Sequence, residues 1–438
     1  MSSEWPYLKI EDVAEKVGMG PFGSSIKVET FVDSGIPVVS GEHLHDITIS
    51  EGRFRYITES HATQLAKSNV FRGDVIFTHA GTIGQVSVVP ENSKFQRYVI
   101  SQRQFFMRCK REVIHPLYVA YYFKSPEGRH KLLANASQVG VPSIARPVTY
   151  LRSIKIPVPP LGVQEEIISI IESLRDRITL LRETNATLEA IAQALFKSWF
   201  VDFDPVRAKM EGRAPEGMDE ATAALFPDSF EETELGAVPK GWRIGKLCDI
   251  LALRNERTKP SEETKSLPYV PIESITAKVP FLEEQKSGDE ANSSLILFRK
   301  GDILFGAMRP YFHKVCIAPF DGVTRTTVFT LRSVNPQASG FALFLAFQES
   351  SIDYATKHSE GSTIPYAKWK NSLENMPIVL PPESLQVAFS EVVSPFVDRA
   401  NGNIEEAQTL ASLRDTLLPR LISGQLRLPV AQDELEAA

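Results

Sequence analysis

A proline pair with a glutamine four residues beyond it occurs twice in this chain, as PPLGVQ at residues 159–164 and as PPESLQ at residues 381–386. Each copy follows a region of roughly 150 residues with strand and turn signals, and each precedes a long helical pattern. An internal repeat has to be identified first because it determines the architecture. The sequence therefore predicts two similar lobes, each ending in a long helix.

Shorter matches support the duplication. Trp5 has a counterpart in Trp242, and FRGDVIF at residues 71–77 resembles FRKGDILF at residues 298–305. The offset between the copies falls from 237 at the tryptophans to 222 at the proline pairs, so the loops differ in length as well as in sequence. We expect a duplicated frame that presents different loops.

The composition is that of an ordinary globular protein, with 438 residues, 43% hydrophobic and 23% charged. This length allows two to four domains with full cores. The three cysteines, Cys109, Cys248 and Cys316, have no CxxC spacing. They are typical of isolated thiols in a reducing cytosol, and not of a metal or disulfide site.

Neither a secretion signal nor a membrane segment is predicted. The first five residues lack a basic segment followed by an apolar one. The longest apolar run, residues 341–347, is too short to span a bilayer. We expect a cytoplasmic protein without membrane contacts.

The net charge of −6 is concentrated in two segments. Residues 201–236 hold ten acidic and three basic side chains, and residues 429–438 hold three more acids. The remainder is neutral to weakly positive, so charge permits DNA-facing patches without demonstrating them.

Each lobe is expected to have an α+β fold. In residues 1–157, short apolar runs such as 36–39, 75–77 and 86–89 are bounded by Gly, Pro and Asp, which predicts strands. Apolar residues at helical spacing predict one helix over about residues 116–134.

The first long helix, residues 164–199, carries core positions at alternating steps of four and three. These are Ile167, Ile171, Leu174, Ile178, Leu181, Asn185, Leu188, Ala192, Leu195 and Trp199. A strict repeat of this kind indicates a coiled-coil seam, in which a single asparagine often determines the register. A helix packed on its own lobe stays open as the alternative.

The second long helix, from about residue 384 to 421, is less regular. Its apolar stripe comprises Phe389, Val393, Phe396 and Ala400, then Leu410, Leu413, Leu417 and Leu421. Pro395 should kink it, and Asn401-Gly402-Asn403 weakens its middle. Since one chain supplies both helices, we expect them to pair antiparallel as a rod about 55 Å long that sets the distance between the lobes.

These signals predict a mixed fold with an internal two-fold repeat, in which two α/β domains are joined by an antiparallel coiled coil. The expected boundaries are 1–157 for the first domain, 158–203 for the first helix, 204–240 for an acidic linker, 241–379 for the second domain, 380–428 for the second helix and 429–438 for a tail.

Catalytic motifs are missing from the sequence. It contains no GxxxxGK[ST] phosphate loop, no HExxH, no GxSxG and no Asn/Asp-Pro-Pro-aromatic motif of an amino-methyltransferase. Residues 81–84 (GTIG) are interpreted as a turn. Asp74 and Asp302 could suggest nuclease carboxylates, but neither is followed by Glu-x-Lys, so we interpret both as turn residues.

Several loops instead carry side chains suited to DNA, and they lie beside equivalent strands in both lobes. Hydroxyls, amides and lysines contact phosphates, whereas Gln and Arg read adenine and guanine edges. A solvated surface is the plainer interpretation of any single cluster. The candidates in the first lobe are Ser24, Ser25, Lys27, Thr78, His79, Thr82, Gln102, Arg103, Gln104, Ser143 and Arg146, and those in the second are Arg309, Tyr311, His313, Lys314, Arg325, Thr326, Thr363, Tyr366, Lys368 and Lys370.

Three motifs resemble the specificity subunit of type I restriction–modification systems. They are IPVPPLGVQEEI at residues 156–167, WFVDFDP at residues 199–205 and the GPFGS loop at residues 20–24. The second repeat departs from the pattern, with QVA at residues 386–388 in place of a Gln-acidic pair. The resemblance covers essentially the whole chain.

The resemblance implies a non-catalytic subunit with two target-recognition domains, each reading one half of a bipartite, asymmetric DNA sequence. It implies that the paired helices set the spacer and dock two modification (methyltransferase) subunits, and that restriction subunits join the complex. The expected contacts for pairing and docking are Ile171, Leu174, Ile178, Leu181, Asn185, Leu188, Leu195 and Trp199 on the first helix and Phe389, Phe396, Leu410 and Leu417 on the second.

No cofactor is expected in this chain, because S-adenosylmethionine, ATP and Mg²⁺ would belong to the partner subunits. Two other classes of function stay open. One is a self-contained DNA enzyme, and the other is a scaffold whose lobes bind proteins. Steeply salt-dependent DNA binding would separate the scaffold from the DNA reader, because phosphate contacts weaken as salt rises.

Overall fold

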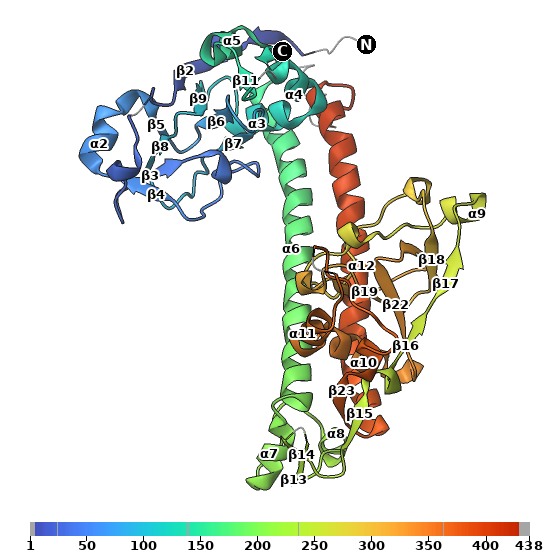
Figure 1. The fold of residues 1–438 in the computed structure, drawn as a ribbon. Helices are drawn as coiled ribbons and strands as arrows, with labels where there is room; N and C mark the ends of the chain where they lie inside the picture. Colours follow the sequence, from blue (N-terminus) through green and yellow to red (C-terminus); the bar gives the residue numbers. More distant parts are fainter. Residues whose placement is uncertain (1–4, 24, 138–139, 235, 362, 429–438) are drawn as a thin grey trace. The chain divides into compact units, whose positions relative to one another are not determined.

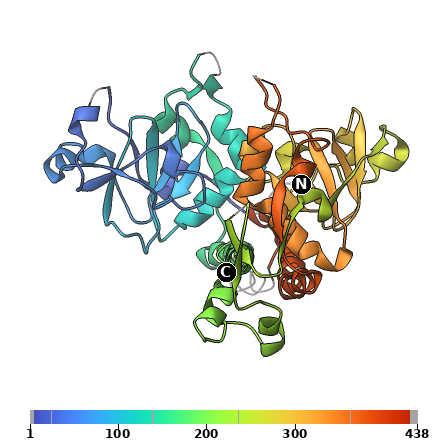
Figure 2. The same ribbon diagram turned by 60° about the horizontal axis from the view of Figure 1, so that its bottom comes forward.

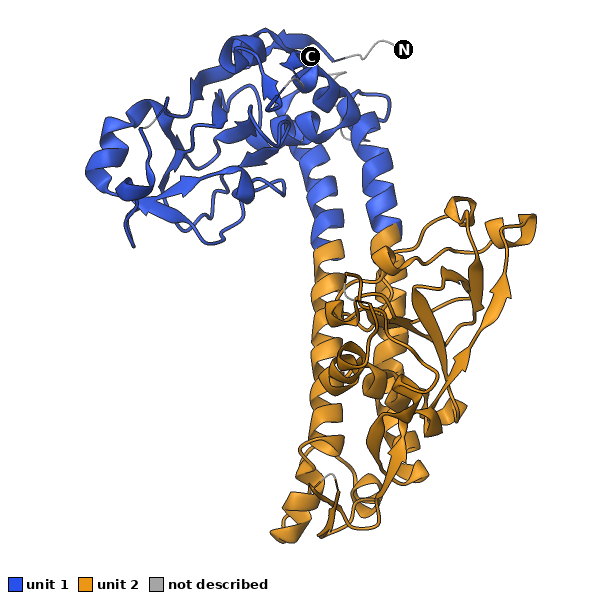
Figure 3. Ribbon diagram, viewed as in Figure 1, with its two compact units in different colours: residues 1–177, 409–438 blue, residues 178–408 orange. Residues whose placement is uncertain are grey.

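The computed structural model describes residues 5–23, 25–137, 140–234, 236–361 and 363–428. The chain divides into two compact units (Figure 3). Unit 1 comprises residues 1–177 and 409–438, and unit 2 comprises residues 178–408. Helices α6 (Leu161–Phe200) and α12 (Glu383–Ile422) each contribute a segment to both units.

Unit 1 contains two four-stranded sheets, ordered β2-β9-β6-β7 and β4-β3-β8-β5 (Figure 1). Its strands are β1 (Tyr7–Lys9), β2 (Ala14–Met19), β3 (Ile36–Val39), β4 (Arg55–Ile57), β5 (Asn69–Phe71), β6 (Val75–Thr78), β7 (Val86–Val88), β8 (Arg97–Ile100), β9 (Gln104–Cys109), β10 (Ala136–Ser137), β11 (Ser143–Ile144) and β12 (Lys155–Pro157). Its short helices are α1 (Ile10–Val13), α2 (Glu59–Gln64), α3 (Pro116–Lys124), α4 (Pro126–Leu133) and α5 (Pro147–Ser153).

Unit 2 repeats the first of these sheets in the order β16-β22-β19-β20, with a three-stranded sheet β17-β18-β21 beside it. Its strands are β13 (Phe230–Thr233), β14 (Gly236–Pro239), β15 (Arg243–Lys246), β16 (Leu251–Arg254), β17 (Glu256–Thr258), β18 (Leu295–Phe298), β19 (Ile303–Gly306), β20 (Val315–Ile317), β21 (Gly322–Arg325), β22 (Val328–Ser333) and β23 (Pro377–Leu380). Its short helices are α7 (Asp204–Met210), α8 (Glu220–Ala224), α9 (Glu262–Lys265), α10 (Ser339–Phe347) and α11 (Glu349–Lys357).

The predicted mixed fold with an internal repeat is confirmed by this matching strand order. The single helix expected over residues 116–134 is wrong, because α3 ends and α4 begins at Ser125-Pro126. Proline disfavours helical backbone in the residue before it, and the Ser125 hydroxyl accepts from Gly128 N to cap the new helix. The segment interpreted as an acidic linker contains α7, α8 and the β13–β14 hairpin.

The repeated proline–glutamine motif anchors the start of each long helix. Gln164 is completely buried, and its Nε2 donates to Pro159 O at 2.8 Å and to Val113 O at 3.0 Å. Its Oε1 accepts from His115 N at 2.8 Å, at the start of α3. Gln386 also donates to the preceding proline carbonyl, Pro381 O, at 2.9 Å. The glutamine therefore ties α6 to the body of unit 1.

We expect Gln164→Ala to lower the free energy of unfolding of unit 1 by about 2–4 kcal/mol, since it removes three hydrogen bonds and leaves buried backbone groups without a partner. The matched change Gln386→Ala should cost unit 2 only about 1 kcal/mol. Native-state hydrogen exchange, resolved to each unit, measures both. Equal losses in the two units would contradict this account of the motif.

The two long helices pair antiparallel within each unit. In unit 2, residues 178–200 of α6 lie beside residues 383–408 of α12 in both views (Figures 1 and 2). Phe196, near the end of α6, contacts Phe389, near the start of α12, with ring centroids 5.5 Å apart. In unit 1, Ile167 and Ile171 share a core with Leu421 and Ile422 at the other end of α12.

The residues of the predicted seam are buried or half-buried, with one exception. Ile171, Ile178, Leu181, Trp199 and Phe389 are buried, whereas Leu174, Asn185, Leu188, Leu195, Phe396, Leu410 and Leu417 are half-buried. The assignment of Leu413 to the stripe is wrong, because this side chain is 43% exposed. Helix α12 continues without interruption through Pro395 and Gly402.

A pair of asparagines forms a polar layer between the helices of unit 2. Asn185 donates from Nδ2 to Ala400 O at 3.1 Å, and Asn403 donates from Nδ2 to Asn185 Oδ1 at 2.8 Å. Asn403, which the sequence pattern marked only as a weak point, is buried. Because a shift of either helix would break both bonds, this layer specifies their register.

Glu189, one turn further along α6, should make the stability of unit 2 depend on pH. Burial, together with the nearby Glu283 carboxylate, raises the pKa of Glu189 from 4.5 to about 7. A carboxyl whose pKa is raised by folding holds its proton more tightly in the folded state, so stability falls as pH rises between these two values. We expect the stability of unit 2 to decrease from pH 4.5 to 7. Glu189→Gln should remove that part of the decrease, and identical pH profiles for the two proteins in urea unfolding would contradict the expectation.

Candidate nucleic-acid interface

A cavity of about 530 Å³, lined by both apolar and polar side chains, lies in unit 1 at the end of β6, where four loops meet. It is lined by Pro21, Ile26, Val28, Phe31, Val38, Ser40, Gly41, Glu42, Arg55, Thr78, Ala80, Thr82, Gln85, Ser101, Gln102, Arg103 and Gln104. Amide, hydroxyl and guanidinium groups therefore face one hollow, as recognition of a base edge requires.

Backbone hydrogen bonds hold these loops together. His79 N donates to Arg103 O at 2.9 Å, and Ile144 N donates to His79 O at 2.8 Å. Gly81 N donates to Pro142 O at 2.9 Å, and Gly81 has a φ of +84°, which favours glycine. The loop after β6 thus lies between the β8–β9 turn and the strand β11, and we call this arrangement the loop clamp.

The glycine-rich loop after β2 packs against the same turn. Gly20 N donates to Gln104 O at 2.9 Å, and a Cβ at Gly20 would lie 2.0 Å from Ser101 O. Only glycine fits this close approach of two backbones. The loop is therefore a wall of the cavity.

Two glutamines orient the polar groups of the cavity. Gln85 accepts from the Thr78 hydroxyl at 3.0 Å and donates from Nε2 to Gly41 O at 3.0 Å, which determines the orientation of its amide. Gln104 is buried and accepts from the Ser101 hydroxyl. Its Nε2 is therefore the end of the amide that remains a donor.

Exposed side chains surround the cavity that contains these two glutamines. Within the part of the chain that the structure describes, the exposed Arg103 guanidinium makes no side-chain hydrogen bond or ion pair. Arg55 lies over the Phe31 ring at 5.2 Å. The half-buried His79 donates from Nε2 to Gln102 O at 3.1 Å, and burial lowers the pKa of its imidazole, so the ring is neutral near pH 7.

Unit 2 builds the same loop clamp from different residues. Ala307 N donates to Thr327 O at 2.9 Å, and Ala367 N donates to Ala307 O at 2.8 Å. Arg309 N donates to Pro365 O at 2.8 Å, as Gly81 N does to Pro142 O in unit 1. The backbone frame is thus repeated while the side chains on it change.

The predicted residues of unit 1 fall into three groups by exposure. Ser25, Lys27, Thr82, Gln102, Arg103 and Arg146 are exposed, His79 and Ser143 are half-buried, and Thr78 and Gln104 are buried in the cavity floor. Ser24 lies outside the described residues. Of these, the structure brings Thr78, Thr82, Gln102, Arg103 and Gln104 together around the cavity.

The predicted residues of unit 2 lie on the clamp loops and beside them. Tyr311, Arg325, Thr326, Thr363, Lys368 and Lys370 are exposed, and Arg309, Lys314 and Tyr366 are half-buried. Tyr366 donates to Thr326 O at 2.5 Å, and Lys368 forms an ion pair with Glu360 at 2.5 Å.

His313 requires a correction, because the structure places it inside the lobe. It is 3% exposed, its Nε2 lies 2.8 Å from Phe347 O, and its ring packs on Phe347. Lys314 likewise turns inward and donates to Ile272 O at 2.8 Å. Both side chains hold the loop in place and leave little surface for a direct DNA contact.

Several cavity residues were not identified from the sequence. Ser40, Gly41 and Glu42 are in the turn after β3, Arg55 is in β4, and Gln85 lies in the loop before β7. No local motif marks them, since their proximity depends on how the two sheets of unit 1 pack.

The buried aspartates have a structural role in both units. Asp74 accepts from Arg108 Nε at 2.8 Å, from Arg108 Nη2 at 2.7 Å and from Phe71 N at 2.9 Å. Asp302 accepts from Arg332 Nε at 2.6 Å and from Arg299 N at 2.7 Å. Each carboxylate thus closes the turn before its strand, as the sequence predicted. Across the described residues, no group of three or more His, Cys, Asp or Glu side chains could hold a metal ion.

A model of the type I restriction modification DNA specificity domain matches residues 2–190 and 239–412 of this chain. The chain belongs to this family. The resemblance seen in its motifs is therefore confirmed, and its role as a specificity subunit is recognition of DNA and not catalysis.

Relatives of known name agree with the family over most of their length. The type I restriction enzyme MjaIX specificity subunit of Methanocaldococcus jannaschii is 26% identical and is aligned over 97% of this chain and 94% of its own. The type I restriction enzyme HindI specificity subunit of Haemophilus influenzae is 25% identical and is aligned over 82% of this chain and 88% of its own. A type I system S subunit from M. genitalium shares the fold, with a TM-score of 0.56, 16% identity and 96% of each chain covered. In the described residues of this specificity subunit, no helix is long and apolar enough to cross a membrane.

Proposed function

We propose that this specificity subunit reads a bipartite, asymmetric DNA target, with one half-site contacted by the loop clamp of each unit. The observation that carries the proposal is the repetition of the clamp with different side chains. Arg103 and Gln102 border it in unit 1, whereas Thr327 and Tyr366 occupy the corresponding region in unit 2. Different side chains on one frame favour two different half-sites over a palindrome.

The proposal extends to the partners. Two modification subunits would supply S-adenosylmethionine and the methylation site, and restriction subunits would supply ATP- and Mg²⁺-dependent chemistry. The paired helices α6 and α12 would set the spacer and dock the modification subunits. The complex would act in the cytoplasm. Both units would contact the same DNA duplex, each at its own half-site.

Mapping of methylated adenines tests the proposal. Cells that contain this chain and its neighbouring modification subunit are compared with cells that lack only this chain. We expect a bipartite, asymmetric motif that disappears with the chain. A palindromic motif, or a methylation pattern unchanged by the deletion, would overturn the proposal.

The same mapping with the variant Arg103→Ala tests the contribution of one residue. The change should relax one half-site and leave the other intact, because a good bidentate contact to a base contributes about 1–3 kcal/mol of discrimination. Lys155→Ala is the control, because Lys155 is an exposed cation on β12 that does not line the cavity, and its loss should leave both half-sites unchanged. Relaxation of both half-sites by Arg103→Ala would contradict the assignment of one half-site to each unit.

A further inference from the structure

An exposed aromatic pair stands at the tip of the clamp loop in unit 2. Tyr311 and Phe312 are 48% and 47% exposed, with ring centroids 4.8 Å apart. They lie in a single 3-10 turn, Pro310–Phe312, between β19 and β20. Large apolar side chains in this position, on a DNA-recognition subunit, need an explanation beyond packing.

The backbone of this turn is strained at both ends. Arg309 has a φ of +51° and His313 has a φ of +52°. Such conformations are unfavourable for residues other than glycine, and they persist only where the surroundings enforce them. The turn is therefore held in a specific shape.

The equivalent loop of unit 1 adopts the same two bends with glycine. Hydrogen bonds from Thr78 N to Gln85 O and from Gly306 N to Lys314 O place the two loops in correspondence. Gly81 and Gly84 both have a φ of +84° where unit 2 has Arg309 and His313. Between these bends unit 1 has only Thr82 and Ile83, so the aromatic pair is specific to unit 2.

Anchors on both sides keep the turn rigid. Arg309 N donates to Pro365 O at 2.8 Å before it, and Pro310 is buried. After it, His313 contacts Phe347 O, and Lys278 N donates to His313 O at 2.8 Å. Lys314 donates to Ile272 O. The buried His313 and the inward-facing Lys314 thus hold the turn so that the rings of Tyr311 and Phe312 stay exposed.

We propose that Tyr311 and Phe312 form an aromatic wedge that stacks on, or inserts into, a base step of the half-site contacted by unit 2. A wedge of this kind unstacks the step and bends the duplex. Every base offers a face for stacking, so the wedge recognises how easily the step deforms more than its hydrogen-bonding edge. Because a rigid turn loses little freedom on binding, the strain would serve preorganisation. The inference rests on the proposed DNA-reading function.

The test uses the full chain assembled with its modification subunits. Duplexes that carry the mapped target receive 2-aminopurine at one position of each half-site in turn, and its fluorescence reports unstacking. With the unaltered chain we expect a fluorescence increase at one step of a single half-site. In Tyr311→Ala/Phe312→Ala that increase should disappear and the affinity should fall about 10- to 100-fold. The double variant Tyr311→Phe/Phe312→Tyr should retain both signals.

Val334→Ala is the matched control. Val334 is a 56% exposed side chain in the same unit. It follows the C-terminal end of β22, whereas Thr327 of the loop clamp precedes the N-terminal end, so truncation of Val334 should change neither the fluorescence nor the affinity. Sedimentation without DNA shows whether the variant still assembles. Failure to assemble would overturn the wedge in favour of a subunit contact, and an unchanged fluorescence increase in the variant would overturn it directly. If the unaltered complex neither binds nor methylates the mapped target, the proposed function itself fails.

Discussion

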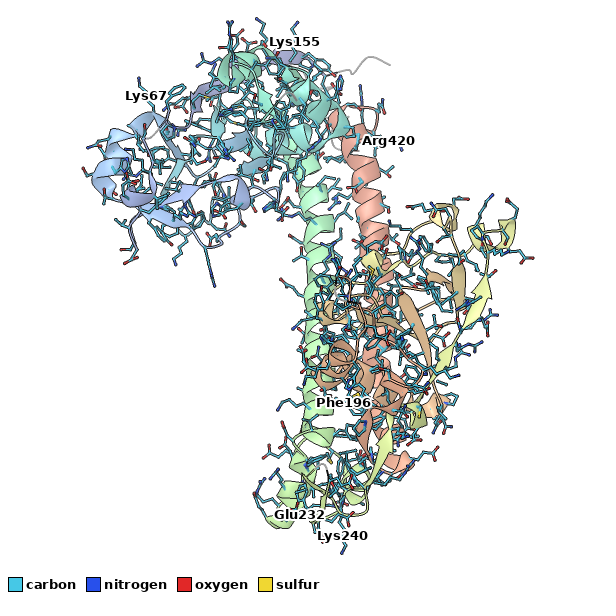
Figure 4. The ribbon with its side chains drawn as sticks, viewed as in Figure 1. Lys67, Lys155, Phe196, Glu232, Lys240 and Arg420 are labelled. Carbon is cyan, nitrogen blue, oxygen red and sulfur yellow. The ribbon has the colours of Figure 1, made fainter. Side chains whose placement is uncertain are left out.

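Phe196→Ala is expected to lower the free energy of unfolding of unit 2 by about 3–5 kcal/mol. Phe196 projects from α6 and is 2% exposed (Figure 4). Its ring centroid lies 5.6 Å from that of Phe341 on α10 and 5.5 Å from that of Phe389 on α12. Truncation would leave a cavity where the two long helices and the lobe of unit 2 share one core.

Urea unfolding followed by tryptophan fluorescence measures this effect. Trp199, Trp242 and Trp369 belong to unit 2, so the signal reports mainly on that unit. Ile191→Ala on the same helix is the control, because Ile191 is 43% exposed and its truncation should cost less than about 1 kcal/mol. Similar losses for the two variants would show that Phe196 does not join the helices to the lobe.

Asp74→Ala is expected to destabilise unit 1 by about 3 kcal/mol, at the lower end of the range for breaking a buried ion pair. Asp74 is 1% exposed, and its removal leaves the Arg108 guanidinium without its charge partner. The lower end applies because the Arg108 side chain is 26% exposed and keeps some contact with water. The turn from Phe71 to Asp74 would lose its acceptor as well.

The double variant Asp74→Leu/Arg108→Met separates charge from packing. It removes both ions, so it should recover part of the stability that Asp74→Ala loses. Hydrogen exchange of β6 and β9 reads out unit 1 alone. A double variant as unstable as the sum of its single changes would contradict a direct Asp74–Arg108 interaction.

The frame of the protein was predictable because its signals are local or periodic. The step pattern from Ile167 to Trp199 requires only the helical repeat, and it identified the seam of α6 correctly. The assignment of Leu413 to the stripe rested on the same spacing and was wrong. In that segment of α12 only tertiary contacts determine which face of the helix is covered.

The cavity in unit 1 was only partly predictable. Gln102, Arg103 and Gln104 are contiguous and could be proposed as a group, but Arg55 reaches the cavity from β4 and Gln85 from the loop between β6 and β7. His313 shows the opposite error, because a histidine among basic and aromatic residues suggested DNA, while the positive φ that turns it inward has no sequence signal outside glycine.

The sequence by itself determined the duplication, the two long helices and the family, since repeats and apolar periods are properties of the chain alone. The tertiary structure decided which side chains share a surface. Asn403 became the partner of Asn185, and the strained turn came to present Tyr311 and Phe312, through contacts between residues distant in the chain. Such contacts depend on how sheets and helices pack, and packing is set by the sum of many weak interactions that no short motif records.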